Sequence, residues 1–568
     1  MNRRDLLAYG TALGGALVFS NSLGDQATTE RGDVLRRDLK AGPVSGADLA
    51  VVNAKVITLE PSQPRASAVL ARNGRIALVG SNRDVLAHAR GIRVFDAGGQ
   101  VLVPGFVDAH THLEMACQAR AYQLQCQTPP YLSLREIFEE MRSRAASTPR
   151  GKWVIARSSF NMQEAVQEKR LATRIELDSI SEDHPVALFA GLHITSLNTR
   201  ALKELGLFDE SSAANLRWKD GRIRKGTSVP RDANGIPIGV ATEIYDLMPA
   251  YALDETRQAL SRYSKELFVA KGITSATTMP ILTNDDFRAD QELQRSGGMP
   301  IRLRAYYIVP QRTTLQGVID MGLLPGMGDD WFRFGGVKFF VDGTEEDGLG
   351  NPLADYKWTQ EELNAAVLQA HAAGLQILMH VIGRGAMDMA VTAIEAALRV
   401  LPKPHRHRLE HAYPIESAAD VRRLMASGIR ATFTPEQVRL PASDGADRRN
   451  PPVRTMIREG FEPMSCTDVA GTIPVFSPLV GIASFVATPA EGGGTPRDEN
   501  VSFEDALRTW TIWSAKGAFE ESEKGSLGVG KLADYAILSA DPEQRSGPEL
   551  FDVEVSATIV GGTVVYER

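Results

Sequence analysis

The sequence predicts an α/β protein whose central domain is a (β/α)8 barrel of the triosephosphate isomerase (TIM) type. Short apolar, β-prone runs such as residues 185–193, 301–309 and 335–343 are separated by segments whose apolar residues recur at steps of three and four. The second pattern is typical of amphipathic helices. Regular alternation of strands and helices favours a parallel sheet, and the span over residues 105–523 is long enough for a complete barrel.

The first residues are typical of an export signal. Arg3 and Arg4 precede an apolar, glycine- and alanine-rich run of modest length, and small residues follow it. The two arginines followed by Asp-Leu-Leu resemble a twin-arginine signal, which serves a route for folded proteins. We expect residues 1–27 to be this signal and residues 28–45 a leader or linker. The mature protein would then lie in the periplasm without stable membrane insertion; the alternatives are an uncleaved anchor or, without a functional signal, the cytoplasm.

The two ends of the folded part are predicted to form one small β-sandwich. Residues 46–104 contain two β-prone runs with an Asn-Gly hairpin signal in the second, and residues 524–568 contain short strands punctuated by Gly-Gly and Pro. The barrel therefore occupies residues 105–523. Within it, residues 211–240 break the strand–helix rhythm and are predicted to be an insertion.

Composition and charge narrow the range of partners. With 43% hydrophobic and 23% charged residues the chain is an ordinary globular protein. A net charge of −7 without a basic stripe gives no reason to expect nucleic acid. The three cysteines cannot build a disulfide framework; Cys117 and Cys126 could pair, but free thiols are the simpler expectation. The expected partners are a small-molecule substrate and, in a homodimer, a second copy of the chain.

The stretch GFVDAHTHLEM, residues 105–115, places His110 and His112 one residue apart after an apolar run. Positions i and i+2 of a strand point the same way, and strand ends of a barrel face its mouth. The two imidazoles can therefore address one ion from one strand end. Alone, such a pair is a weak signal.

Four further strand ends carry polar side chains. Lys338 lies inside the apolar run GGVKFFVDG, His380 ends LQILMH, His411 ends HRLEHA, and Asp468 follows SCT. An unpaired ammonium in such a strand would be costly. A neutral lysine amine can instead react with carbon dioxide to form a carbamate, which can bridge two divalent ions. Imidazole and hard oxygen ligands suit zinc or related ions.

From about Ala47 to Arg568 the chain resembles metal-dependent amidohydrolases, in the amidohydrolase family 3 branch that includes N-substituted formamide deformylases. The motifs that carry the resemblance are LVPGFVDAHTH, VKFFVDG, HVIGRGAMDMAV, RLEHA and KGSLGVGKLADYAIL. One departure is Thr467, which stands where relatives commonly have serine directly before the metal-binding aspartate. The ligand itself is intact, so only local packing is affected.

The resemblance implies a site with two divalent metal ions, zinc being the expected metal. One ion would be bound by His110, His112 and Asp468. Carboxylated Lys338 would bridge to the second ion, which His380 and His411 hold. All six ligands therefore come from predicted strand ends: His110, His112, Lys338, His380, His411 and Asp468.

The implied reaction is hydrolysis of a carbon–nitrogen bond in a small molecule by a hydroxide that bridges the metals. Asp468 would take the proton of the water and deliver it to the leaving nitrogen. The bond could belong to an amide or formamide, and a carbamate, cyclic imide or lactone remains open. His193 and Glu243 are candidate substrate-facing residues, with a structural histidine as the alternative reading of His193.

Two other functions compete with a binuclear hydrolase. A mononuclear deaminase on the same scaffold dispenses with the bridging lysine and places a catalytic glutamate shortly after the fifth-strand histidine. Here Lys338 is present and Val-Ile-Gly-Arg follows His380, which disfavours that function. A non-catalytic relative would usually have lost ligands, and this chain retains all of them.

Overall fold

The computed structural model describes residues 46–160, 162–214, 216–343, 356–412, 415–435, 451–469, 476–488 and 498–568. The predicted export signal, residues 1–27, and leader, residues 28–45, lie outside this part of the chain. Within it, no helix is both long and apolar enough to cross a bilayer. Cys117 and Cys126 are both buried, and their thiols are free.

The predicted barrel is confirmed. One eight-stranded, all-parallel sheet has the order β20-β19-β18-β17-β16-β15-β14-β8. The amides of Asp468 and His112 donate to the carbonyls of His110 and Val469, at 2.9 and 3.2 Å, so the segment after β20 closes the ring against β8. The strands are β8 (Phe106–Thr111), β14 (Ile273–Ile281), β15 (Arg302–Ile308), β16 (Phe332–Phe340), β17 (Gln376–Val381), β18 (Arg408–His411), β19 (Arg430–Phe433) and β20 (Met464–Ser465).

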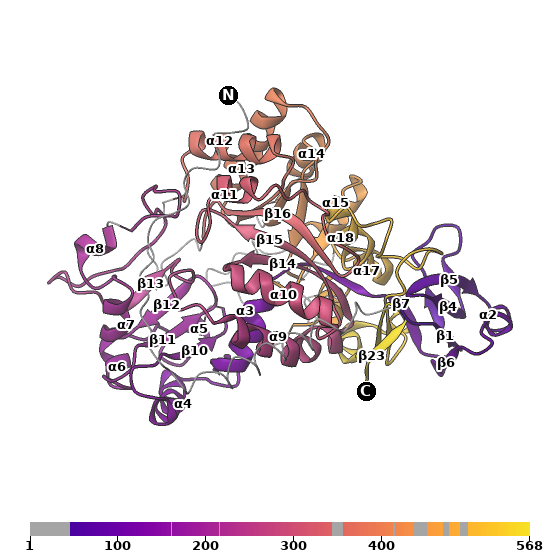
Figure 1. Cartoon of the computed structure of the whole chain (residues 1–568), viewed down its shortest axis with the longest axis horizontal. Helices are drawn as coiled ribbons and strands as arrows, with labels where there is room; N and C mark the ends of the chain where they lie inside the picture. Colours follow the sequence, from indigo (N-terminus) through magenta and orange to yellow (C-terminus); the bar gives the residue numbers. More distant parts are fainter. Residues whose placement is uncertain are drawn as a thin grey trace, which may run out of the picture.

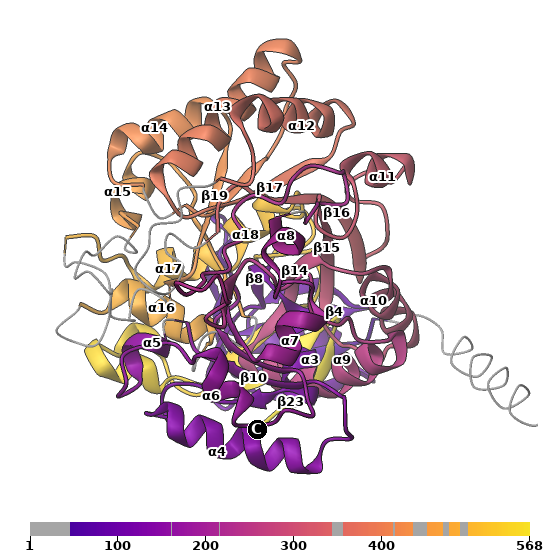
Figure 2. The same ribbon diagram turned by 90° about the vertical axis from the view of Figure 1, so that its left-hand side faces the viewer.

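Helices surround this sheet (Figure 2). Side chains of β16 alternate: Val337 and Phe339 pack outward against α12 and α13, so Lys338 points into the barrel. Several helices begin with a hydroxyl cap, such as Thr283 before α10 and Thr359 before α12. The helices are α3 (Leu113–Tyr122), α9 (Leu253–Leu267), α10 (Asn284–Ser296), α11 (Leu315–Asp320), α12 (Gln360–Ala372), α13 (Arg384–Val400), α14 (Ala418–Ala426), α15 (Val453–Arg458), α16 (Pro478–Val486), α17 (Phe503–Thr509) and α18 (Ile512–Gly517), with the 3₁₀ turn η1 (Val269–Lys271).

The chain segment between β8 and β14 forms a separate five-stranded sheet with the strand order β13-β12-β11-β10-β9. The apolar run 185–193, which resembles a barrel strand in sequence, forms β11 of this sheet. The predicted insertion, residues 211–240, is one part of this larger segment. Its elements are β9 (Leu124–Gln125), α4 (Leu134–Ser147), β10 (Val154–Ser158), α5 (Met162–Ala165), α6 (Arg174–Asp178), β11 (Val186–Ala190), β12 (Ile194–Leu197), α7 (Thr199–Glu204), α8 (Glu210–Ala214) and β13 (Val240–Thr242).

The two chain ends form a β domain of two sheets, which lies across the barrel from the five-stranded sheet (Figure 1). In the six-stranded sheet, β7 pairs with β21, so the N-terminal and C-terminal segments share one sheet. The elements are β1 (Leu49–Val52), β2 (Lys55–Ile57), β3 (Arg65–Ala66), β4 (Ala68–Arg72), β5 (Arg75–Gly80), α2 (Asn82–His88), β6 (Arg93–Asp96), β7 (Val101–Pro104), β21 (Tyr535–Leu538), η4 (Pro542–Gln544), η5 (Gly547–Asp552), β22 (Val555–Val560) and β23 (Thr563–Glu567).

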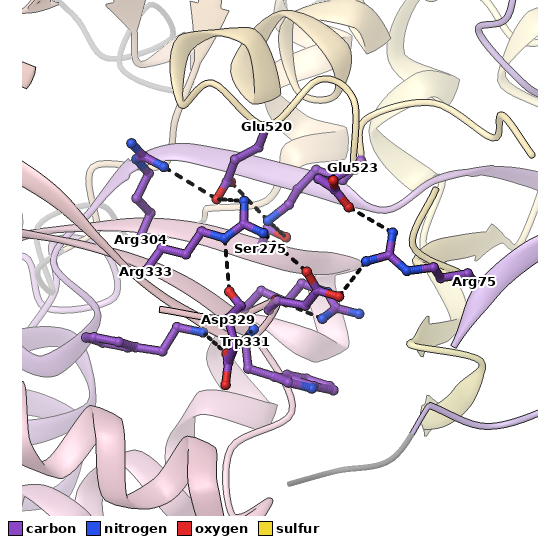
Figure 3. A network of polar contacts seen from close by, with 12 residues as sticks. Arg75, Ser275, Arg304, Asp329, Trp331, Arg333, Glu520 and Glu523 are labelled. Carbon is purple, nitrogen blue, oxygen red and sulfur yellow. Dashed lines mark hydrogen bonds and ion pairs between the residues drawn. The ribbon is translucent and has the colours of Figure 1, made fainter. Parts of the chain in front are cut away.

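An ion-pair network joins this β domain to the barrel near the amino ends of the barrel strands (Figure 3). Arg75 of β5 contacts Asp330 at 2.6 Å and Glu523 at 2.8 Å. Glu520 lies 3.5 Å from Arg333 and 3.6 Å from Arg304. These contacts attach the β domain to the end of the barrel that lies opposite the strand ends with the candidate ligands.

Candidate metal centre

The predicted ligands His110, His112 and Asp468 lie at one point where the barrel closes. The Nε2 atoms of His112 and His110 are 3.0 and 3.5 Å from Oδ1 of Asp468. One possible ligand atom from each of the three residues falls within 4.8 Å of the other two. Both histidines are buried, and the Asp468 carboxylate is partly exposed. Two imidazoles and one carboxylate form a set that suits a divalent ion such as zinc.

The other predicted ligands extend this cluster across the barrel. The His411 ring lies 4.9 Å from the His110 ring and 4.7 Å from the His380 ring, measured between centroids. Nδ1 of His411 is 3.8 Å from Oδ2 of Asp468. Lys338 is fully buried on β16, the strand that pairs with β17, which carries His380. The structure thus brings histidines, lysine and aspartate from β8, β16, β17, β18 and the end of β20 toward one centre.

Unpartnered buried atoms show that this centre fits cations. His110 Nε2, Lys338 Nζ and His380 Nε2 are buried and have no hydrogen-bond partner among the described residues, whereas Nε2 of His112 contacts Asp468. A buried polar atom without a partner is costly, and such groups call for a specific explanation. Several of them in one cluster match a site whose partners are metal ions, and a carboxylated Lys338 would turn its orphan nitrogen into an oxygen ligand.

The protonation states also suit metal binding, which requires neutral imidazole. Burial lowers the pKa of His411 to about 4, and burial likewise holds the pKa of His110 well below its usual range. Burial lowers the pKa of Lys338 to about 8, so part of the amine is neutral near physiological pH. Burial alone would raise the pKa of Asp468, but the surrounding imidazoles outweigh it and keep the carboxylate ionised.

Backbone strain concentrates at this centre. His411 and Asp468 have φ values of 71° and 50°, in the left-handed region that residues with a side chain rarely adopt. In β18 the side chain of Leu409 faces the outer helices, so strict alternation would also direct His411 outward. Its left-handed backbone turns the ring inward instead. Such strain is held where the surrounding structure requires it, typically at functional sites.

A buried carboxylate orients His110. Glu410 accepts a hydrogen bond from Nδ1 of His110 at 2.8 Å, which leaves Nε2 directed at the centre. Arg408 donates to both oxygens of Glu410 at 2.9 Å, and both side chains are fully buried. Burial alone would raise the pKa of Glu410, but the Arg408 guanidinium and the His110 ring hold it well below its ordinary value. Carboxylates of this kind fix the tautomer of a metal-binding histidine.

We expect Glu410→Gln to weaken metal binding by about ten- to one-hundred-fold, because the neutral amide no longer fixes the His110 tautomer or balances Arg408. Competition with a chromogenic chelator measures the affinity. Asp534→Asn is the matched control: Asp534 pairs with buried Arg302 at 2.7 Å, away from the centre. The control should lose thermal stability and keep its metal affinity. Unchanged metal affinity in Glu410→Gln would show that Glu410 has no orienting role.

Asp108 connects β8 to the segment that carries Asp468. It accepts hydrogen bonds from the Thr467 hydroxyl at 2.6 Å and from the Thr467 amide at 3.0 Å. The His110 amide donates to the same carboxylate at 3.3 Å. Asp108 thus joins the backbone at His110 to Thr467, the residue directly before Asp468. A serine would present the same hydroxyl, so the departure from the family pattern leaves this contact intact.

The two predicted substrate-facing residues, half-buried His193 and buried Glu243, form a pair beside the centre. His193 lies with its ring 5.1 Å from the His380 ring, and its Nδ1 contacts Oε1 of Glu243 at 2.7 Å. The other oxygen of Glu243 accepts from Nζ of buried Lys357 at 2.8 Å. The geometry places His193 at the edge of the centre, whereas Glu243 lies behind it and holds its ring.

The residues at the site that were not predicted include Asp108, Phe340, Lys357 and Glu410. Two had a signal in the sequence, because an acidic residue inside an apolar strand needs a buried partner. Asp108 lies two residues before His110, and Glu410 directly before His411. Phe340, whose ring stacks on His380 at 4.7 Å, and Lys357 gave no such signal.

Comparison with known proteins shows the family of the chain. Residues 93–566 match the amidohydrolase family. An N-substituted formamide deformylase of Arthrobacter pascens is 28% identical over 555 residues, covering 92% of this chain and 98% of the relative. A metal-dependent hydrolase of Pyrococcus horikoshii, of uncharacterised function, has a similar structure with a TM-score of 0.66 at 19% identity, over 88% of this chain and 99% of that one.

A zinc complex of an atrazine chlorohydrolase from Arthrobacter aurescens shares the fold with a TM-score of 0.52 at 14% identity, over 91% of this chain and 95% of that one. The chain belongs to the amidohydrolase family, because the match covers most of its length. The predicted family is confirmed. So is the predicted class of enzyme, a hydrolase of carbon–nitrogen bonds other than peptide bonds.

Proposed function

We propose that the protein hydrolyses an amide or formamide bond of a small molecule at a binuclear metal centre. The observation that carries this proposal is the set of buried, unpartnered nitrogens of His110, Lys338 and His380 on barrel strands β8, β16 and β17, beside the cluster of His110, His112 and Asp468. His110, His112 and Asp468 would hold one divalent ion, and His380 and His411 the other. Bound at these residues, two such ions would acidify a water molecule and polarise the carbonyl of the substrate.

Lys338 would supply the bridge as a carbamate. Its neutral amine attacks carbon dioxide, a new N–C bond forms, and one proton leaves the nitrogen. The product is an anionic carboxylate in place of an ammonium. This change from a positive to a negative charge is needed because a cation beside two dications is strongly disfavoured. The lowered pKa of Lys338, about 8, favours the neutral amine from which the carbamate forms.

Asp468 would move the proton during hydrolysis. Its carboxylate is ionised and only partly covered, so it can reach a water molecule placed between the two groups of ligands. It takes the proton of this water as the oxygen attacks the carbonyl carbon. It then delivers the proton to the leaving nitrogen, which departs as a neutral amine. His193, held by Glu243, lies where it can donate a hydrogen bond to the substrate.

The proposed reaction is tested with metal-loaded full-length protein and a panel of small N-formyl and N-acyl amines. The panel also contains lactones, carbamates, cyclic imides and aminated heterocycles of similar size. We expect turnover of N-formyl or N-acyl amines, detected as release of free amine, and its loss when a chelator removes the metal. Preference for a lactone, or release of ammonia from an aminated ring, would contradict the proposed bond.

A further inference from the structure

A small cavity that contains two guanidiniums lies between the five-stranded sheet and the mouth of the barrel. Its volume is about 60 Å³. Since one buried water needs about 10–15 Å³, the cavity has room for a small polar group, although not for a whole substrate. Met115 of α3, Leu282 after β14 and Arg312 after β15 line it from the barrel, and Arg157 and Phe189 line it from the sheet.

Arg157 is the unusual residue of this cavity. Its side chain is 3% exposed, and the guanidinium lies 4.4 Å from the centre of the Phe189 ring. Nε donates to Oε1 of Gln123 at 2.9 Å and Nη1 to the carbonyl of Gly191 at 3.4 Å. Both acceptors are neutral, and no described carboxylate forms an ion pair with Arg157. A buried arginine is almost always paired with an anion, so this one lacks its usual partner.

Arg312 adds a second guanidinium to the same cavity. Its Nη2 donates to the carbonyl of Met248 at 3.0 Å, and its buried Nε has no hydrogen-bond partner among the described residues. The carboxylate of Asp286 also lines the cavity. Thr283 and Gln118 donate hydrogen bonds to its oxygens, and the bonds from Thr283 cap the start of α10. Two guanidiniums and one carboxylate leave a single positive charge.

The cavity is close to the metal centre. Met115 lies one helical turn after His112, and Tyr245 is shared between the cavity and the apolar cluster that contains Phe340. The Tyr245 ring lies 6.3 Å from the His193 ring. Met115 and Tyr245 therefore line the cavity on the side that faces the metal centre. A substrate bound at the ligands and extending past these two side chains would reach Arg157.

We propose that this cavity binds a carboxylate of the substrate, so that the enzyme acts on N-acyl or N-formyl amines that carry an acid group away from the scissile bond. This inference rests on the proposed function. A guanidinium binds a carboxylate through two parallel hydrogen bonds, which a neutral group of the same size cannot reproduce. One net positive charge and the small volume match a monovalent carboxylate better than a phosphate. The chemical class is thus an N-acylated amino acid.

The experiment compares N-formyl-ω-amino acids of increasing chain length with N-formyl alkylamines of the same lengths. With metal-loaded wild-type enzyme, one length of acid should have a kcat/KM about 10²-fold above its neutral counterpart. Arg157→Met should abolish this preference and leave turnover of the neutral compounds unchanged. Arg174→Met, on the same segment but outside the cavity, is the matched control and should keep the preference. Equal kcat/KM for acids and neutral compounds in the wild type would overturn the inference.

Two further measurements test the carboxylate site independently of the folding of Arg157→Met and of the proposed reaction. If Arg157→Met fails to fold, Arg312→Met tests the cavity from the barrel side, and a preference that survives there overturns the proposal. Binding of the same acids to metal-free protein is measured by calorimetry. Acids that bind wild type and not Arg157→Met, without any turnover, would support the carboxylate site while the proposed reaction fails. Turnover of N-formyl alkylamines without any binding of the acids would support the proposed reaction and overturn the carboxylate site.

Discussion

Lys338→Ala should lose metal and activity together, with kcat/KM falling by about 10³-fold or more. Lys338 is fully buried on β16, and its Nζ has no hydrogen-bond partner among the described residues. As a carbamate it supplies a negative charge beside that of Asp468, whereas the imidazoles of the site supply none. Without it, the two groups of ligands have no bridge. Elemental analysis of the purified variant and its kinetics measure the two losses.

Adding small carboxylic acids to the Lys338→Ala variant tests whether a carboxylate at this position is what the site requires. Formate or acetate can occupy the space vacated by the side chain, so millimolar additions should restore part of the metal content and activity. Lys357→Met is the matched control, because Lys357 is also buried but pairs with Glu243 through a 2.8 Å contact. That variant should keep its metal. Normal metal content and turnover in Lys338→Ala would contradict the role of Lys338 as a bridging ligand.

Asp468→Asn should lower kcat by about 10²- to 10⁴-fold, because the amide cannot accept the proton of the attacking water. Its shape is retained, and the five other candidate ligands are untouched, so substantial metal should remain. Stopped assays together with metal analysis distinguish loss of proton transfer from loss of metal. The Asp534→Asn control applies the same substitution to a buried aspartate outside the centre. Turnover close to wild type in Asp468→Asn would contradict the acid–base role.

Much of the site could be predicted because its side chains lie at the ends of apolar runs. His110, Lys338 and His380 each lie in or near the end of a mostly apolar strand, where a polar side chain is conspicuous. The parallel barrel then brings such strand ends to one face. Local patterns and a general rule of the fold were therefore sufficient to group these residues.

The remaining features depend on contacts that a local pattern does not contain. The run that forms β11 has the apolar character of a barrel strand, and only its pairing with β10 and β12 assigns it to the other sheet. The inward turn of His411 comes from a left-handed backbone rather than from strand alternation. Arg157 meets the barrel mouth only because β10 lies over α3 and the end of β14. None of these follows from spacing along the chain.

One measurement tests directly whether carboxylated Lys338 bridges a binuclear centre. Metal-loaded enzyme is prepared with ¹³C-labelled bicarbonate, and the carbamate carbon and the metal content are measured on the same active sample by NMR and elemental analysis. The account predicts a carbamate signal with two metal ions per chain, both absent in Lys338→Ala. Fully active enzyme that holds two metal ions with an unmodified Lys338 amine would contradict it.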